Sequence, residues 1–156
     1  MKKIIFIFFL IFSTVHAEKI ERLGFYNLQE LLEDDNLTYK IIKSCVSLNS
    51  TITEITRVDY PDLSKSFFET ANYLYPFGIL TLSKVKKMSY KDVEKEYMAK
   101  VSSQTANYVD FLKANGVANQ SFIKGTFIGD DLNFCNEIRS AIEITISESN
   151  KLKSNN

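Results

Sequence analysis

Two cysteines, Cys45 and Cys135, and one histidine, His16, carry the most reactive side chains of this chain. A cysteine or serine nucleophile is usually activated by a histidine that takes up its proton, and histidine with cysteine is a common zinc-ligand set. The two cysteines are far apart in the sequence and do not form the Cys-x-x-Cys motif of thiol–disulfide exchange enzymes. The chemistry open to this protein therefore depends on whether His16 stays in the mature chain.

The first 17 residues have the order of a secretory signal peptide. Two lysines precede an unbroken apolar run over residues 4–12, and Val15 and Ala17 stand at positions −3 and −1 of a cleavage site. A membrane-spanning helix needs about 20 apolar residues, so this run is too short for an anchor. We expect residues 1–17 to be removed after Ala17 and the protein to be exported, to the periplasm in a Gram-negative bacterium and otherwise by secretion.

Removal of the leader takes His16 with it, and the remaining chain has neither histidine nor tryptophan. Histidine acid–base catalysis, histidine-activated nucleophiles and histidine-containing zinc sites are then excluded. We expect a non-enzymatic protein without a metal or cofactor. An enzyme would have to use a carboxylate pair, and we interpret the candidate pairs as solvated helix faces: Glu94 with Glu96, and Glu30 with Asp34.

The charge of the mature chain is close to balanced. After loss of the two leader lysines, 17 basic residues face 19 acidic ones, a net charge of −2. Nucleic-acid-binding proteins show a basic excess, and attraction to anionic lipid needs one too. We therefore expect another exported protein as the partner, with no nucleic acid and no stable membrane insertion; the sequence does not predict the oligomeric state.

In the periplasm or outside the cell, Cys45 and Cys135 are expected to be oxidised. One intramolecular disulfide with a structural role is the favoured interpretation. Two buried free thiols or an intermolecular bridge are the alternatives.

Low glycine and proline content favours helices over β-structure. Five glycines and two prolines are too few for the regular turns of a sandwich or barrel. We predict an all-α fold, a single domain over residues 18–147 built as a bundle of four or five helices, followed by a flexible polar tail over residues 148–156.

Apolar stripes place the main helices. A short helix after Asn27 precedes a long one over residues 37–57, whose apolar residues are spaced by four, three, four and three: Ile41, Cys45, Leu48, Ile52 and Ile55. Pro61 opens the next helix, with a stripe of four residues: Leu63, Phe67, Ala71 and Leu74.

Two more helices complete the prediction. Ser89 begins a helix that Gly116 ends, with one apolar side: Val93, Tyr97, Val101, Tyr108 and Leu112. Asp130 or Asp131 caps the last helix, where Cys135, Ile138 and Ile142 share a face. Both cysteines thus lie on apolar stripes, and a disulfide would join the first long helix to the last.

Three segments are ambiguous. Pro76 should end or kink its helix, and the apolar residues 77–82 form a buried helical turn that continues to Lys87. Residues 117–129 form a loop or a small hairpin around Lys124 and Gly125, and we favour the loop. Residues 141–147 fit a helix or, by the alternation of their isoleucines, a strand.

A dense group of aromatic residues is the candidate interaction surface: Phe67, Phe68, Tyr73, Tyr75 and Phe77. Aromatic side chains, tyrosine among them, are enriched at protein interfaces, although packing around Pro76 explains the group as well. The favoured function is a protein-binding factor of the inhibitor or immunity type. The alternative is an envelope stress chaperone or structural protein; a chaperone would expose Phe67, Phe68 and Tyr75 on conditional unfolding and would use carboxylates as its pH trigger.

Overall fold

A computed structural model describes residues 20–154, apart from the side chains of Glu30 and Leu32. The leader predicted over residues 1–17 lies outside this range. The described chain is all-α, as predicted, and its elements follow in this order: a 3₁₀ turn η1 (Leu23–Phe25), α1 (Leu28–Glu33), α2 (Asp35–Thr56), α3 (Pro61–Lys86), α4 (Tyr90–Asn119) and α5 (Ile128–Ser154).

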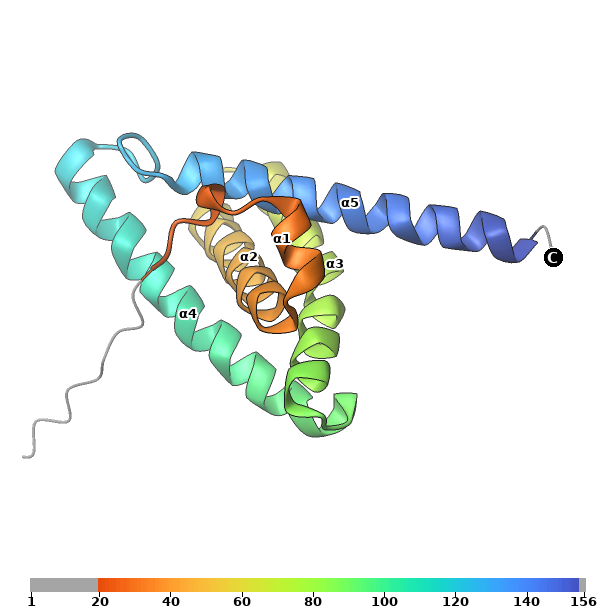
Figure 1. Cartoon of the computed structure of the whole chain (residues 1–156). Helices are drawn as coiled ribbons and strands as arrows, with labels where there is room; N and C mark the ends of the chain where they lie inside the picture. Colours follow the sequence, from red (N-terminus) through yellow and green to blue (C-terminus); the bar gives the residue numbers. More distant parts are fainter. Residues whose placement is uncertain (1–19, 155–156) are drawn as a thin grey trace, which may run out of the picture.

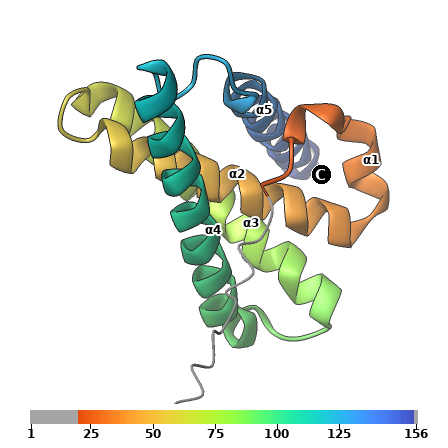
Figure 2. The ribbon, with the colours of Figure 1, turned by 90° about the vertical axis from the view of Figure 1, so that its left-hand side faces the viewer.

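Helix α2 is the centre of the fold. It packs against α1, α3, α4 and α5 (Figure 2), and nine consecutive residues, 41–49, are buried. A helix that is buried on every side needs neighbours on every side, and this explains why the other helices wrap around it. Helix α5 runs across the bundle, and its C-terminal part extends beyond the other helices (Figure 1).

The predicted stripes of α2 and α4 are confirmed. Asp34 caps α2 by accepting hydrogen bonds from the backbone N–H groups of Asn36 and Leu37. Ser89 caps α4 by accepting from the N–H of Asp92 at 3.3 Å. All five predicted apolar residues of α4 are buried, with Gln104 as a polar member of the same stripe. Caps and periodicity were sufficient signals for these two helices.

Helix α3 continues through Pro76, so of the two predicted effects of this proline the helix end is wrong. The kink stays a prediction. Proline removes one backbone hydrogen bond, and here the ring lies on the exposed side of the helix. Leu74 and Ile79, both completely buried, hold the helix on the core on either side of it. The predicted helical continuation is confirmed and ends at Lys87, which adopts the left-handed conformation.

Leu63 does not belong to the buried stripe of α3 as predicted, because it is 48% exposed. It lies in the first turn of α3, near the end of α2, where little of the neighbouring helix is left to cover it.

The connection from α4 to α5 corrects two further predictions. Helix α4 does not stop at Gly116; it continues to Asn119 and ends at Gln120 in the left-handed conformation. Gly116 instead lies against the ring of Phe122. A Cβ atom on residue 116 would lie 2.9 Å from Cε1 of that ring. The favoured loop is present but shorter, over residues 120–127.

Helix α5 begins earlier than predicted. Neither Asp130 nor Asp131 caps it, because the helix starts at Ile128, whose N–H donates to Oγ1 of Thr126 at 3.3 Å. Residues 141–147 are helical, and α5 continues to Ser154. The flexibility of the tail 148–156 stays a prediction.

One close approach fixes the spacing of α3 and α4. A Cβ atom on Gly78 would lie 1.8 Å from the hydroxyl oxygen of Tyr97. Only glycine leaves room for this ring, which is completely buried between the two helices. The contact belongs to the larger of two core clusters, which also contains both cysteines.

Candidate functional site

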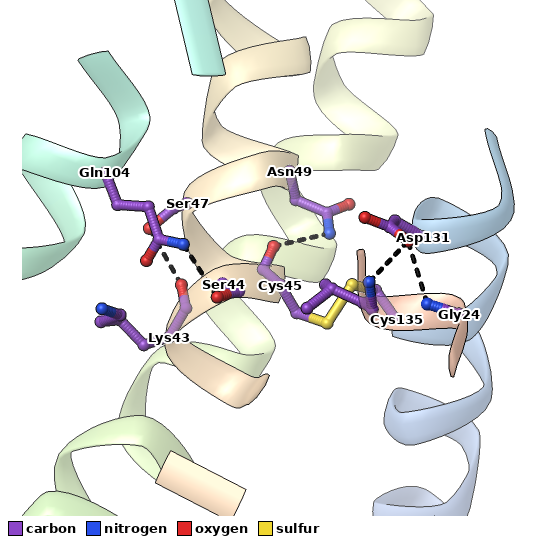
Figure 3. The surroundings of a disulfide bond; sticks show 10 residues. Gly24, Lys43, Ser44, Cys45, Ser47, Asn49, Gln104, Asp131 and Cys135 are labelled. Carbon is purple, nitrogen blue, oxygen red and sulfur yellow. Dashed lines mark hydrogen bonds between the residues drawn. A yellow bond between two sulfur atoms is a disulfide. The ribbon is translucent and has the colours of Figure 1, made fainter. Parts of the chain in front are cut away.

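The cysteines form a disulfide between α2 and α5. The Cα atoms of Cys45 and Cys135 are 5.4 Å apart, and both side chains are completely buried. Free cysteines are absent from the described residues. The bond therefore lies inside the larger core cluster, where it fixes α5 to the central helix (Figure 3).

Polar side chains form a band along the contact between α2 and α4. Gln104 donates to the Ser44 hydroxyl at 2.8 Å, and the Ser47 hydroxyl lies 3.3 Å from the carbonyl oxygen of Val101. The Thr51 hydroxyl lies 3.2 Å from the carbonyl oxygen of Thr105. Small hydroxyl residues let the two helices approach and satisfy one another's polar groups. This band was not predicted, because short polar side chains on a helix usually indicate a face in contact with solvent.

Asp131 was predicted as a candidate cap of the last helix, but in the structure it lies inside α5 and has another role. Its carboxylate is completely buried, and Oδ1 accepts hydrogen bonds from the N–H groups of Leu23 and Gly24 at 2.8 and 3.0 Å. Oδ2 has no hydrogen-bond partner among the described residues. Burial raises the pKa of Asp131 to about 6, although the hydrogen bonds from Gly24 and Leu23 lower it. The available signal was its position, four residues before Cys135 on the same apolar face.

The five predicted aromatic residues do not form one surface. Successive residues of a helix turn by about 100°, and the structure separates the five accordingly. Tyr73 and Phe77 lie together, with ring centroids 5.6 Å apart, whereas Tyr75 contacts Tyr97 at 5.2 Å.

The other two of the five lie near the start of α3. Phe67 packs against the second core cluster and Phe68 is exposed. A role for the aromatic group in binding stays a prediction.

Four exposed apolar residues lie close in the sequence, in the α2–α3 turn and at the start of α3. Val58, Tyr60, Leu63 and Phe68 are 83, 64, 48 and 56% exposed. We call these four residues the α3 entry surface. They lie in the turn and the first two turns of α3, and Asp59 and Asp62 flank them. Large apolar side chains gathered in this way are unusual on a surface without a partner.

The predicted carboxylate pairs have structural contacts. Glu96 binds Lys86 and Lys100, and the hydrogen bond from Lys86 lowers the pKa of its carboxyl. Glu94 is exposed and two residues away, so it points to another side of the helix. Asp34 is occupied as the cap of α2. The lowered pKa of Glu96 is the opposite of the raised pKa that a general acid needs.

The surface hollows are open and mixed in character. One of about 550 Å³ is lined by Tyr73 of α3 and by residues of the projecting part of α5, among them Glu143, Ile146 and Asn150. Another, of about 450 Å³, lies beside the N-terminal segment and is lined by Ile20, Phe25 and Phe127 among others.

Residues 20–154 contain neither a metal-binding cluster nor a membrane-spanning helix. No three or more histidine, cysteine, aspartate or glutamate side chains lie close enough to hold a metal ion. None of the helices in this part of the chain has the length and apolarity needed to cross a bilayer. Comparison of the chain with protein-family models, with curated proteins and with solved structures gives no match.

Proposed function

We propose that this protein is an exported, non-enzymatic binding factor that recognises another exported protein through the α3 entry surface. The observation that carries the proposal is the exposure of Val58, Tyr60, Leu63 and Phe68 on one corner of a tightly packed bundle. Interfaces obtain most of their affinity from a few large apolar or aromatic anchors in a central patch. This corner supplies a tyrosine, a phenylalanine and two aliphatic residues.

The corner is held in place by its surroundings. The Ser64 hydroxyl donates to the carbonyl of Thr53 at 2.8 Å, and this hydrogen bond links the start of α3 to the end of α2. Phe67, one turn after Leu63, packs on the second core cluster. A surface that is ordered before binding loses less conformational entropy when the partner arrives.

The charges around the corner indicate the chemistry of the partner. Asp59 and Asp62 lie beside the apolar residues, whereas Arg57 is paired with Glu54. A complementary partner has an apolar depression with basic residues at its rim. The association rate is then expected to fall as salt concentration rises.

Export is part of the proposal. Its support is the order of residues 1–17 and the buried disulfide, a bond that is rare in reducing compartments. The compartment is the periplasm in a Gram-negative host and the exterior otherwise.

An envelope stress chaperone is the second candidate. It would release Phe67 and Tyr75, now half-buried, upon unfolding. Acid is a poor trigger through Asp131, because a carboxyl whose pKa is raised in the folded state favours folding at low pH. Glu96, with a lowered pKa, acts in the opposite direction at the surface.

The test begins with capture of partners by the tagged protein from the exported fraction under mild cross-linking. The captured candidate is then purified and its binding to the protein measured directly. One saturable partner at neutral pH supports the proposal. A broad set of unrelated proteins, bound only under stress, supports the chaperone, and the absence of any enrichment contradicts both.

Variants connect the binding to the surface. The double variant Leu63→Ser/Phe68→Ser removes two exposed anchors without disturbing the core. Val117→Ser/Leu152→Ser is the matched control, because these residues are 88 and 70% exposed on other parts of the molecule. Binding is expected to be lost in the first variant and kept in the second.

A further inference from the structure

The N-terminal segment of the described chain, residues 20–27, is tied across α5 as a strap. Leu23 is buried in the larger core cluster, with Cys45 and Cys135. Arg22 forms a salt bridge with Asp130 at 2.9 Å. Ile20 and Tyr26 pack against the two core clusters, and Glu21 forms a salt bridge with Lys40 of α2 at 2.6 Å. The contacts with α5 are therefore one part of what holds the strap.

The central contact is the carboxyl group of Asp131. Its Oδ1 atom accepts the N–H groups of Leu23 and Gly24, the first residues of η1. The group is completely buried, and its second oxygen has no hydrogen-bond partner among the described residues. One oxygen thus holds the strap and the other is a buried acceptor without a donor.

A polar side chain of α2, Asn49, also faces this site. Asn49 lies one turn after Cys45, as Asp131 lies one turn before Cys135, and Figure 3 shows the Asn49 side chain pointing toward Asp131. The amide nitrogen of Asn49 is used by the carbonyl of Cys45 at 2.8 Å. This leaves the amide oxygen to face the carboxyl group. Two acceptors repel each other unless one carries a proton.

We propose that Asp131 and the strap form a proton-controlled latch, in which the protonated carboxyl group closes the strap onto α5 and ionisation loosens it. The proton removes the uncompensated negative charge from the buried site. Oδ1 continues to accept from Leu23 and Gly24 in either state. Release of the strap exposes the part of the core that Leu23 covers, next to the disulfide.

Other charged groups around the site modulate the latch. Arg22 of the strap favours the ionised form, and Asp130 of α5 disfavours it. Tyr108 of α4 also interacts with Asp131, and its own pKa is raised, first by burial, so it stays neutral. On α2 the facing group is the uncharged Asn49. Burial outweighs the hydrogen bonds from Gly24 and Leu23 and the charge of Arg22, and raises the pKa of Asp131 to about 6, against an ordinary value near 3.8.

The sign of the pH effect follows from these two values. With the strap released, Asp131 meets water and titrates in the ordinary range; with the strap closed it titrates near pH 6. Closure is therefore strongest below about pH 4 and weakens as pH rises to about 6. The difference of about two pKa units corresponds to a loss of about a hundredfold in the closing equilibrium.

Hydrogen exchange of the Leu23 and Gly24 amides measures the latch. Protection factors are obtained by NMR between pH 4 and pH 7, after division by the intrinsic rate at each pH. We expect them to fall about fiftyfold over this range and to stay below the protection of the α2 amides over residues 44–48 at every pH, because the strap opens without unfolding of the bundle. Strap protection that does not fall over this range, or that equals the protection of the α2 amides at every pH, would overturn the latch.

Two variants test whether Asp131 causes the pH dependence of strap protection. Asp131→Asn keeps an accepting oxygen, cannot ionise and is expected to remove the pH dependence of strap protection. Asp130→Asn is the matched control at the neighbouring, exposed carboxyl group, and it should keep the dependence. Retention of the full pH dependence in Asp131→Asn overturns the proposal.

A measurement on the unmodified protein covers the case in which Asp131→Asn does not fold. The side-chain carboxyl carbon of Asp131 is followed by NMR as pH is varied. A midpoint near pH 6 that coincides with the shift of the Leu23 and Gly24 amides is expected. A midpoint near 4 overturns the latch.

Discussion

Removal of the Cys45–Cys135 disulfide is expected to lower stability more than any single side-chain contact in the structure. The bond joins residues 90 positions apart. For a loop of this length, the loss of entropy in the unfolded chain corresponds to about 4–5 kcal/mol. In a domain of this size that free energy corresponds to a fall in melting temperature of roughly 15 °C.

Three forms of the protein separate the bond from the space it fills. The oxidised and the reduced protein differ by the bond alone, and Cys45→Ala/Cys135→Ala adds the cost of two small cavities at completely buried positions. Alanine is preferable to serine, because a serine hydroxyl would be buried beside apolar neighbours. Thermal unfolding followed by circular dichroism gives the three melting temperatures.

The expected order is oxidised protein, reduced protein and double-alanine variant, with the largest step between the first two. Melting temperatures within about 2 °C for the oxidised and reduced proteins would refute the reasoning, since the bond would then constrain an unfolded chain that is already restricted.

Three further changes test the packing and the buried charge. Gly78→Ala places a Cβ atom against Tyr97 and should lower the free energy of unfolding in urea by about 1–3 kcal/mol. In Gly116→Ala the new Cβ atom meets only the side chain of Phe122 in the loop, and the helix gains propensity. A loss of unfolding free energy above about 1 kcal/mol in Gly116→Ala would contradict the account. Tyr97→Phe removes a buried hydroxyl that has no partner among the described residues and should leave stability unchanged or raise it by up to about 1 kcal/mol; a clear loss would reveal a missed hydrogen bond. Stability of the wild type relative to Asp131→Asn should fall by about 2.4 kcal/mol as pH rises from 4 to 7, because the pKa of Asp131 is raised to about 6. A constant difference across this range would be inconsistent with that pKa.

Sequence analysis located the helices because their signals are local. The apolar periodicity of α2 and α4 and the Ser89 cap follow from spacing along the chain, whereas the Asp34 cap was not predicted. The disulfide was expected from the compartment of an exported protein, and the structure confirms it. The errors occurred where tertiary contact overrides a local preference. Pro76 is tolerated because the core holds α3 on both sides of it, and Gly116 lies inside α4 against the ring of Phe122 rather than at a helix stop.

The candidate site was harder to predict, because it depends on which helix faces are covered. Five aromatic residues that are close in sequence point in different directions around α3, and only Phe68 belongs to the α3 entry surface. Val58 and Tyr60 are exposed because they lie in a turn beyond the reach of the other helices. The role of Asp131 required knowledge that residues 23 and 24 return to α5, a contact of long sequence separation that no local pattern shows.

Binding of a purified partner to the α3 entry surface is the most direct test of the central claim. The affinity of the wild type, Phe68→Ser and Val117→Ser for the captured partner is measured by isothermal titration calorimetry at neutral pH. The account predicts that Phe68→Ser weakens binding by about tenfold or more, a loss of about 1.4 kcal/mol or more, and that Val117→Ser binds as the wild type does. Equal affinity of all three proteins would contradict it.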